Sequence, residues 1–395
     1  MTGQYKASWY AVAGPNGDLT WRVDSPAKAI AAKVCKIPDK NGFAHLYWPN
    51  TSKDFPWYFD LTFEDGSTER VRSRKRWEAL CEQRARVTNR EIVYPLQEGS
   101  AAVWTRPLSF QAAHMLELKQ QGVRTVSEVD DNYLSAEKLN VFMKKAGWGE
   151  NDRDNHARSI STSDGLIVST EYLRDVYLKG LREMFGKKLV PEIFVCRNHI
   201  DEQSFVERIP ERKDGRLRIG YMGSDSHIWD VDLIYDALLT AYRMGHEIVF
   251  IGIGPGVVAE RLGQKKSRKK WSEIPYTHIP WQNDGFRGMA LPLDIGFAPL
   301  IIDQHTSGKS DIKWMEYAMS GAATIAQNSV VYNKTLVHGE TGLLAGSPAE
   351  FTARMLTLIA DDDIRERLVT NTKQYITDNR LLANNKKEWE DAVYG

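Results

Sequence analysis

The second half of the chain alternates short apolar segments with longer helix-like segments, and this pattern constrains the fold more than any other feature. The apolar segments are RLRIGYMG (216–223), EIVFIG (247–252), YTHIPW (276–281), DIGFAPL (294–300) and AATIAQ (322–327). Segments typical of helices begin near Asp230, Gly285, Ser310 and Pro348. Strands that alternate with helices predict a parallel sheet with helices on both faces. Ligands of such sheets bind beyond the carboxyl ends of the strands.

The first half shows the same alternation with more interruptions. Candidate strands are SWYAVAG (8–14), AAVWTRP (101–107), VRTVSEVD (123–130) and DGLIVST (164–170). The sequence WYFDLTFEDGSTERV (57–71) predicts a β-hairpin that turns at Asp65-Gly66, inside an insertion over about residues 42–74. The whole pattern predicts an α/β protein in which both halves are doubly wound.

The length of the chain favours two domains, because 395 residues exceed what one ordinary core accommodates. The segment ERIPERKDGR (207–216) is polar, strongly charged and contains proline, so it is the candidate linker. We therefore predict an N-terminal domain over residues 1–207 and a C-terminal domain that starts at residue 208.

Charge and cysteine content exclude several classes of protein. Lys plus Arg equals Asp plus Glu, at 52 each, so no overall field attracts nucleic acid or anionic membrane. Cys35, Cys81 and Cys196 are widely separated, which predicts neither a disulfide framework nor a zinc site. We find no secretory signal at the start and no apolar run near the roughly 20 residues that cross a bilayer. These features predict a soluble, cytoplasmic protein without transmembrane contact.

The segment HTSGKSDIKWMEYAMSG (305–321) is the strongest local indication of a binding site. The residues that recur at the spacing of a buried helical face are Ile312, Met315, Glu316 and Met319. A buried carboxylate needs partners, because an isolated buried charge is costly. Ligand hydroxyls would supply them for Glu316, and so would a salt bridge with Lys313 or a distant arginine.

The start of the same helix is a candidate anion site. Its unpaired backbone N–H groups and positive dipole end lie beside Gly308, Lys309 and Ser310, an arrangement suited to a diphosphate. A P-loop would require glycine where the chain has Asp303, so the ATPase interpretation fails.

Two glycine-rich segments follow predicted strands. In GIGPG (252–256), Gly252 and Gly254 would let the backbone pass close to a nucleotide, or would simply form a tight turn. A dinucleotide-binding loop fits poorly, because Val257 stands where its third glycine belongs.

The other glycine-rich segment is GYMGSDSHIWD (220–230). It places Gly223, Ser224 and His227 just beyond a predicted strand. His227 is a candidate ligand contact, and the alternative is a cap for the following helix.

The N-terminal half contributes fewer candidates. In EVDDNY (128–133), Asp130 and Asp131 would form either a metal–diphosphate site or a helix cap and turn, and we favour the latter, with no metal. Arg106 and His114, near the end of a predicted strand, are candidate acceptor-side residues, together with Asp130 and Asp131. The basic run KKSRKK (265–270) would contact phosphate or form a solvated loop.

Taken together, these motifs resemble the retaining GT-B glycosyltransferases of group 1, over about residues 164–373. CRNHIDEQSF (196–205) resembles the family's Pro-Asn-Gly-Val-Asp…Phe segment, and GYMGSDSH its glycine-rich donor loop. FIGIGPG (250–256) resembles its Val-Gly-x-Gly-Pro element, and HGETGLLAGSPAEF (338–351) its His-Gly-x-x-Gly-Leu-Leu segment. KSDIKWMEYAMSGAATIA (309–326) resembles the donor helix of a prokaryotic, phage-like branch.

The resemblance implies a fold and an activity. It implies two Rossmann-like domains that face each other across a cleft, with the donor domain over residues 208–378 and a last helix, 379–395, that packs back on the first domain. It also implies metal-independent transfer, with retention, of a hexosyl or pentosyl group from a nucleotide sugar, most commonly a UDP-sugar. The acceptor would be a glycan, a protein or a modified DNA base.

The resemblance also suggests roles for single residues. Glu316 matches the second glutamate of the family's Glu-x7-Glu pair, which holds the ribose hydroxyls. Gly308 stands in place of the first glutamate, which commonly holds the donor sugar. Glu316, Lys309 and His227 are the catalytic candidates. The donor-binding candidates are Gly223, Ser224, Gly252, Gly254, Gly308, Ser310 and Lys313.

Two alternatives belong to other classes of protein. The glycine at position 308 suggests a non-catalytic subunit that binds sugar nucleotides as a scaffold. An NAD-dependent oxidoreductase is suggested by fold analogy alone.

Overall fold

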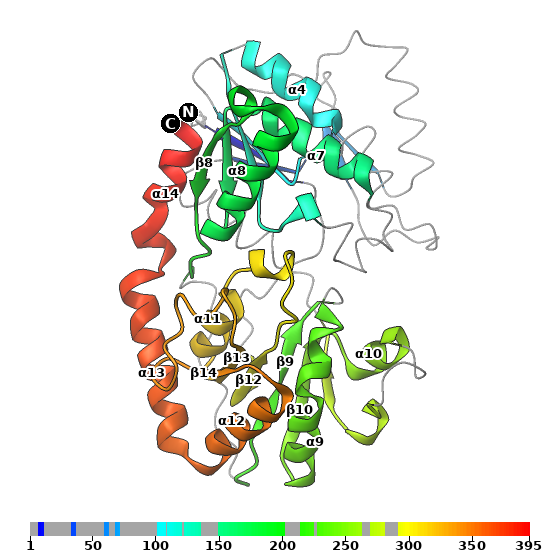
Figure 1. Ribbon diagram of the computed structural model, residues 1–395, viewed down its shortest axis with the longest axis vertical. Helices are drawn as coiled ribbons and strands as arrows, with labels where there is room; N and C mark the ends of the chain where they lie inside the picture. Colours follow the sequence, from blue (N-terminus) through cyan, green and yellow to red (C-terminus); the bar gives the residue numbers. More distant parts are fainter. Residues whose placement is uncertain are drawn as a thin grey trace.

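The computed structural model describes residues 101–107, 109–120, 122–135, 149–201, 214–224, 227–262, 269–280 and 291–395, and the backbone of four earlier strands. Those strands are β1 (Ala7–Ala11), β2 (Lys33–Lys36), β3 (Phe59–Thr62) and β4 (Thr68–Val71). Two six-stranded sheets, both entirely parallel, lie one above the other in Figure 1.

The first sheet has the strand order β2-β1-β5-β6-β7-β8. Its later strands are β5 (Ala101–Thr105), β6 (Arg124–Val129), β7 (Gly165–Val168) and β8 (Glu192–Val195). Alternate residues point to opposite faces: Val126 and Ile167 pack against the last helix, whereas Leu166 and Val168 pack against α7 (Glu150–Thr162) and α8 (Glu171–Phe185). Both faces of the first sheet are therefore covered by helices, which explains why strands such as β5 and β7 are continuous apolar runs.

The predicted hairpin is confirmed in its strands. β3 and β4 pair antiparallel with Thr62 opposite Thr68, so the chain reverses between them. The turn itself, with Asp65 and Gly66, lies outside the described residues, as do Trp57 and Tyr58. The hairpin forms a separate two-stranded sheet, as expected for an insertion.

The second sheet has the order β11-β10-β9-β12-β13-β14. Its strands are β9 (Arg218–Gly223), β10 (Glu247–Gly252), β11 (Thr277–Ile279), β12 (Ile295–Ala298), β13 (Ala323–Gln327) and β14 (Leu343–Ala345). In chain order this is 3-2-1-4-5-6, so the direction of winding reverses between β9 and β12. Such a reversal opens a crevice beyond the carboxyl ends of those two strands.

Helices cover both faces of the second sheet. One layer contains α9 (Tyr235–Arg243) and α12 (Pro348–Ala360), and the other contains α11 (Ile312–Met319). α12 begins at the predicted residue: Pro348 is its first residue, and the Ser347 hydroxyl accepts a hydrogen bond from the Glu350 N–H. The helix predicted near Gly285 lies outside the described residues.

Three short strands do not appear among the predicted ones: β2, β8 and β14. β14 has three residues and lies within HGETGLLAG, where glycines interrupt the apolar run. It is a strand because it pairs with β13, which ends 16 residues earlier in the chain. Pairing over such a distance produces no local sequence pattern from which the strand could be predicted.

The last two helices connect the two halves of the molecule. α13 (Asp362–Asn379) packs on the second sheet, and α14 (Leu382–Tyr394) continues along the first (Figure 1). Trp389 and Val393 of α14 are fully buried in the core that covers β5, β6 and β7. α10 (Pro255–Leu262) and α4 (Ser109–Gln120) complete the layers.

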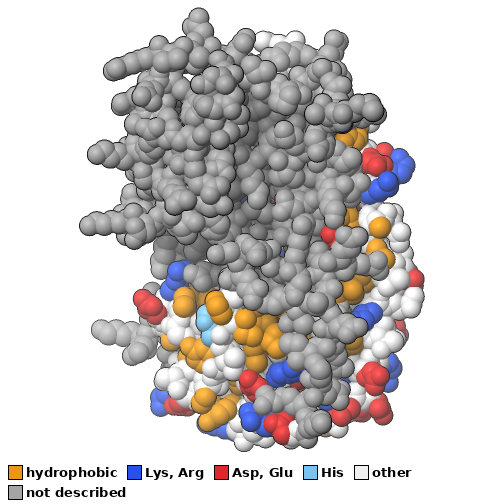
Figure 2. Space-filling model, turned by 180° about the vertical axis from the view of Figure 1, so that it is seen from behind, with side chains coloured by type: hydrophobic (Ala, Val, Ile, Leu, Met, Phe, Trp, Pro, Cys, Tyr) orange, Lys and Arg blue, Asp and Glu red, His pale blue; other side chains and the backbone are white. Residues whose placement is uncertain are grey.

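The surface carries charges of both signs. Seen from behind, acidic and basic side chains are interspersed with hydrophobic ones over the second domain (Figure 2). Among the described residues, no helix combines the length and the apolar character that crossing a bilayer requires.

Candidate functional site

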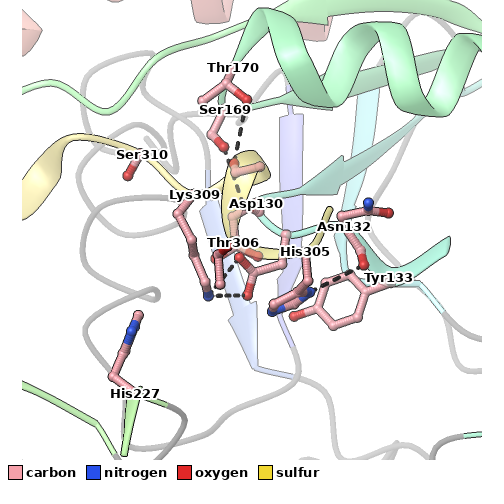
Figure 3. A network of polar contacts seen from close by, with 12 residues as sticks. Asp130, Asn132, Tyr133, Ser169, Thr170, His227, His305, Thr306, Lys309 and Ser310 are labelled. Carbon is pink, nitrogen blue, oxygen red and sulfur yellow. Dashed lines mark hydrogen bonds and ion pairs between the residues drawn. The ribbon is translucent and has the colours of Figure 1, made fainter. Parts of the chain in front are cut away.

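The two domains meet where the carboxyl end of β6 faces the loop that follows β12. Asp131 and Lys309 form an ion pair between the domains, with Nζ 2.8 Å from the carboxylate. One residue further, Asn132 Nδ2 donates a hydrogen bond of 3.0 Å to the Gln304 carbonyl. Figure 3 shows Lys309, His305 and Thr306 gathered against Asp130, Asn132 and Tyr133. The acidic segment of the first domain thus contacts the predicted anion site of the second.

The charge state of this pair follows from its surroundings. Burial alone would raise the pKa of Asp131, but Lys309, His305 and Arg106 together outweigh it and hold the pKa well below its usual range. Asp131 is therefore ionised at neutral pH, and Lys309 is held at the domain interface by an opposite charge. An anionic ligand at Lys309 would compete with this carboxylate.

Gly308 lies at the end of the short helix η8 (Thr306–Gly308), directly under the first domain. A Cβ atom at this position would lie 2.7 Å from Leu173 Cδ2 and 3.6 Å from Asn132 Cβ. Leu173 belongs to α8 and is fully buried in the hydrophobic core of the first domain. A glutamate side chain here would require the buried Leu173 side chain to move, which gives a packing reason for glycine at this position.

The start of α11 is anchored from two directions. Asn198 Nδ2 donates a hydrogen bond of 2.7 Å to Ser310 Oγ, which leaves the Ser310 hydroxyl proton available to an acceptor. Asp311 binds the Arg380 guanidinium through both oxygens, at 2.7 and 2.9 Å. Burial would raise the pKa of Asp311, but Arg380 and the hydrogen bond from the Thr335 hydroxyl together outweigh burial and lower it, so the carboxylate is ionised and its charge is balanced.

His227 does not cap the helix that follows it. Its Nδ1 lies 2.8 Å from Asp230 Oδ2, and its Nε2 lies 3.5 Å from Lys313 Nζ. Figure 3 shows His227 and Ser310 to one side of the Lys309 network. The structure thus places the candidates around the start of α11 in two groups, one on Lys309 and one on Lys313.

Glu316 is buried, as the helical spacing predicts. It is 5% exposed, between Met315 and Tyr317 of α11, which are fully buried. Tyr317 extends to β9 and β12, where its hydroxyl donates to the Phe297 carbonyl and accepts from the Met222 N–H. This anchoring holds the helix that carries Glu316 against the two strands at which the winding reverses.

The glycine-rich segments have clear packing roles. A Cβ at Gly223 would lie 2.1 Å from the Tyr221 hydroxyl, so only glycine fits. Gly252 has a φ of 84°, and its carbonyl accepts a 2.7 Å hydrogen bond from His278 Nε2. The Ile253 N–H donates to the Gly223 carbonyl, which ties the two segments together. Gly254 directly precedes α10, and Ser224 lies just beyond β9.

Arg106 and Asp130 pair within the first domain. Two guanidinium nitrogens of Arg106 lie 3.0 and 2.7 Å from the Asp130 carboxylate, and Arg106 adopts a left-handed φ of 53°. Asp130 and Asp131 thus each contact a basic side chain, and Asn132 forms a local turn through Ser135 Oγ. His114 belongs to α4, but its side chain lies outside the described residues.

The basic run is described only in part. Residues 265–268 lie outside the described residues, and Lys269 and Lys270 form ion pairs with Asp236 and Glu273. In the described part of the chain, no cluster of three His, Cys, Asp or Glu side chains could hold a metal ion.

Asp230, Asn198 and Arg380 belong to this region but were not among the predicted site residues. Asp230 stands three positions after His227, a spacing that indicates a local contact. Arg380 and Asp311 are 69 positions apart, so no local pattern indicates their pairing.

The comparisons with known proteins concern the fold. No protein-family model and no curated protein sequence matches the chain. The structure of Anabaena HepE in complex with UDP is 12% identical, covers 98% of each chain and has a TM-score of 0.58. Sucrose-phosphate synthase from Thermosynechococcus elongatus is 11% identical over 98% of each chain, with a TM-score of 0.59.

A third similar structure is the catalytic domain of starch synthase IV from Arabidopsis thaliana, bound to ADP and acarbose. It is 12% identical, covers 100% of this chain and 99% of its own, and has a TM-score of 0.57. The similarity extends over both domains, and it confirms the predicted GT-B fold.

Proposed function

We propose that the protein is a glycosyltransferase that moves a sugar from a nucleoside diphosphate to an acceptor hydroxyl. The observation that carries the proposal is the start of α11, where Lys309, Lys313 and Ser310 surround a helix N-terminus. This start follows β12, one of the two strands at which the winding reverses. The similar structures of HepE and starch synthase IV contain UDP and ADP, so a nucleoside diphosphate is the first ligand to test.

The proposed reaction builds charge on the leaving diphosphate. The N–H groups at the start of α11 and the two lysines would stabilise that charge, and Ser310 would donate a hydrogen bond, without a metal. Glu316 would accept hydrogen bonds from the ribose. We further propose retention of configuration, a UDP-sugar donor and, as acceptor, a glycan, a protein or a modified DNA base.

A thermal-shift screen tests the donor. Purified protein is heated with UDP, ADP, GDP and their sugars, with and without a divalent metal, because a ligand of the folded state raises the melting temperature. We expect one nucleotide to raise it independently of metal, and Glu316→Ala to reduce the shift. Absence of a shift with every nucleotide would overturn the proposed donor site.

A second candidate is a non-catalytic subunit that binds sugar nucleotides. The packing of Leu173 on Gly308 favours it, because the side chain that commonly holds the donor sugar is missing and would have to displace the buried Leu173 side chain. Slow hydrolysis of the bound donor without acceptor would exclude this candidate. Binding without any hydrolysis or transfer would support it.

A further inference from the structure

A chain of three polar side chains connects the β9 side of the crevice with α11. Asp230 begins the short helix η6 (Asp230–Ile234), and its Oδ2 lies 2.8 Å from His227 Nδ1. Lys313, in the first turn of α11, places Nζ 3.5 Å from His227 Nε2. The side chains of His227 and Asp230 are 12% and 6% exposed, so protein atoms fix most of their surroundings.

Both oxygens of Asp230 are engaged. Oδ1 accepts a 2.7 Å hydrogen bond from the Ile301 N–H, at the loop after β12, and Oδ2 faces His227. An ionised carboxylate only accepts hydrogen bonds, so Nδ1 of His227 must carry the proton. The lone pair of the neutral ring then lies on Nε2, which faces Lys313.

The ring is neutral at physiological pH. Burial is the largest cause that lowers the pKa of His227 to about 4; Lys313 and Lys309 act in the same direction, and Asp230 only partly opposes them. His227 therefore offers Lys313 a hydrogen-bond acceptor rather than a second positive charge. The acceptor helps to hold Lys313 at the positive end of the helix, where an ammonium group is otherwise disfavoured.

We propose that Asp230 and His227 are positioning residues for Lys313: the carboxylate fixes the tautomer of the imidazole, and the Nε2 lone pair holds the ammonium group at the start of α11, where it binds the diphosphate. The part that concerns the diphosphate rests on the proposed function. The part that concerns the tautomer does not.

The tautomer is measured without any ligand. In protein labelled with 15N-histidine, the resonances of His227 are assigned by their loss in His227→Gln, and we expect the Nδ1–H form in the wild type. In Asp230→Asn, the Ile301 N–H keeps the amide oxygen, so the amide NH2 group faces Nδ1. We then expect the Nε2–H form. An unchanged tautomer, or an Nε2–H wild type, would overturn the proposal.

The effect on Lys313 is measured by calorimetric titration with UDP. With Nε2–H directed at its ammonium group, Lys313 loses the His227 acceptor, so we expect Asp230→Asn to weaken UDP binding about tenfold, equivalent to about 1.4 kcal/mol. We also expect Asp230→Asn to add no loss in a Lys313→Ala background, because both changes act on one contact. Losses that simply add would contradict positioning through Lys313.

Two controls complete the experiment. Asp236→Asn makes the same change of charge on α9, where Asp236 pairs with Lys269, and should leave UDP affinity and the tautomer unchanged. If Asp230→Asn does not fold, His227→Gln replaces it in the same cycle with Lys313→Ala. A wild type that binds none of UDP, ADP and GDP overturns the proposed function, whereas the tautomer experiment still decides the roles of Asp230 and His227.

Discussion

At the scale of the residue, His156 shows how burial sets a charge state. Its Nδ1 lies 2.8 Å from the Pro107 carbonyl, which only accepts, so Nδ1 carries the proton. Nε2 lies 3.0 Å from the Tyr177 hydroxyl, whose single proton is also within reach of the Asp131 carbonyl at 3.1 Å. Burial is the largest cause that lowers the pKa of His156 to about 4; the Pro107 hydrogen bond opposes it, and Arg106 acts in the same direction as burial. The folded protein therefore holds a neutral imidazole here.

This charge state predicts a pH dependence of stability. The unfolded chain takes up a proton near pH 6.5, whereas the folded chain takes it up near pH 4, so stability falls as the pH decreases through that window. His156 should cost about 2 kcal/mol at pH 5 relative to neutral pH. Urea unfolding of His156→Gln at pH 7.5 and 5 should show a drop smaller by that amount. Equal drops in variant and wild type would contradict the low pKa.

Residue-scale features differ in how far the sequence predicts them. The burial of Glu316 followed from the helical spacing of its neighbours, because that spacing reports which face of one helix is covered. The pairing of Lys309 with Asp131 did not, since the two residues are 178 positions apart and belong to different domains. The sequence indicated the segments that contain Asp131 and Lys309 as separate candidate sites, but it did not indicate that the two segments are in contact.

At the scale of the element, the close contact between η8 and α8 limits the size of the side chain that fits at position 308. Gly308 has an ordinary φ, so alanine there would not strain the backbone. The Leu173 methyl group, 2.7 Å from the Cβ position, is the obstacle. Thr170, the N-cap of α8, adds a hydrogen bond from its hydroxyl to the Gly308 carbonyl.

Substitution at Gly308 should therefore destabilise through overpacking. We expect Gly308→Ala to cost about 1–3 kcal/mol of unfolding free energy, measured by chemical denaturation. In a Leu173→Ala background, Gly308→Ala should leave the free energy of unfolding almost unchanged, because removal of the leucine side chain makes room for the added methyl group. Gly346→Ala is the control: its nearest atom would be 3.7 Å from the Cβ, so it should be neutral or slightly stabilising. An equal cost in both backgrounds would exclude Leu173 as the cause.

The elements themselves were largely predictable. β10 spans Glu247–Gly252, the predicted residues, since a buried parallel strand is a continuous apolar run. α11 begins at Ile312, two residues after the predicted start near Ser310, and the side chain of its N-cap residue Asp311 binds Arg380 and Thr335 instead of an N–H group of the first turn. Edge strands such as β8 and β14 were missed, because their partners rather than their composition define them.

At the scale of the whole molecule, the chain crosses between the domains more than once. The Ile200 N–H donates to the Arg380 carbonyl, and the Leu382 N–H donates to the Ile200 carbonyl. The start of α14 therefore pairs with the segment that leaves β8, and Arg380 also binds the Asn198 carbonyl. Both crossings lie beside the start of α11, so changes in domain arrangement would act directly on the proposed anion site.

The ion pair between Asp131 and Lys309 is the contact through which ligand and domain arrangement should be coupled. It connects the domains at the residue proposed to bind the diphosphate. A diphosphate at Lys309 would have to displace or repel the Asp131 carboxylate. The unliganded arrangement should therefore oppose binding.

Asp131→Asn is then expected to strengthen the binding of UDP, by about threefold to tenfold or about 0.7–1.4 kcal/mol, in calorimetric titration. The amide keeps the size of the side chain and removes the charge that competes with the ligand. Asp130→Asn is the matched control, because its carboxylate pairs with Arg106 inside the first domain and should change UDP affinity less. Weaker binding by Asp131→Asn would show instead that the carboxylate holds Lys309 in the geometry that the diphosphate requires, and the ion pair would then be part of the binding site rather than its competitor.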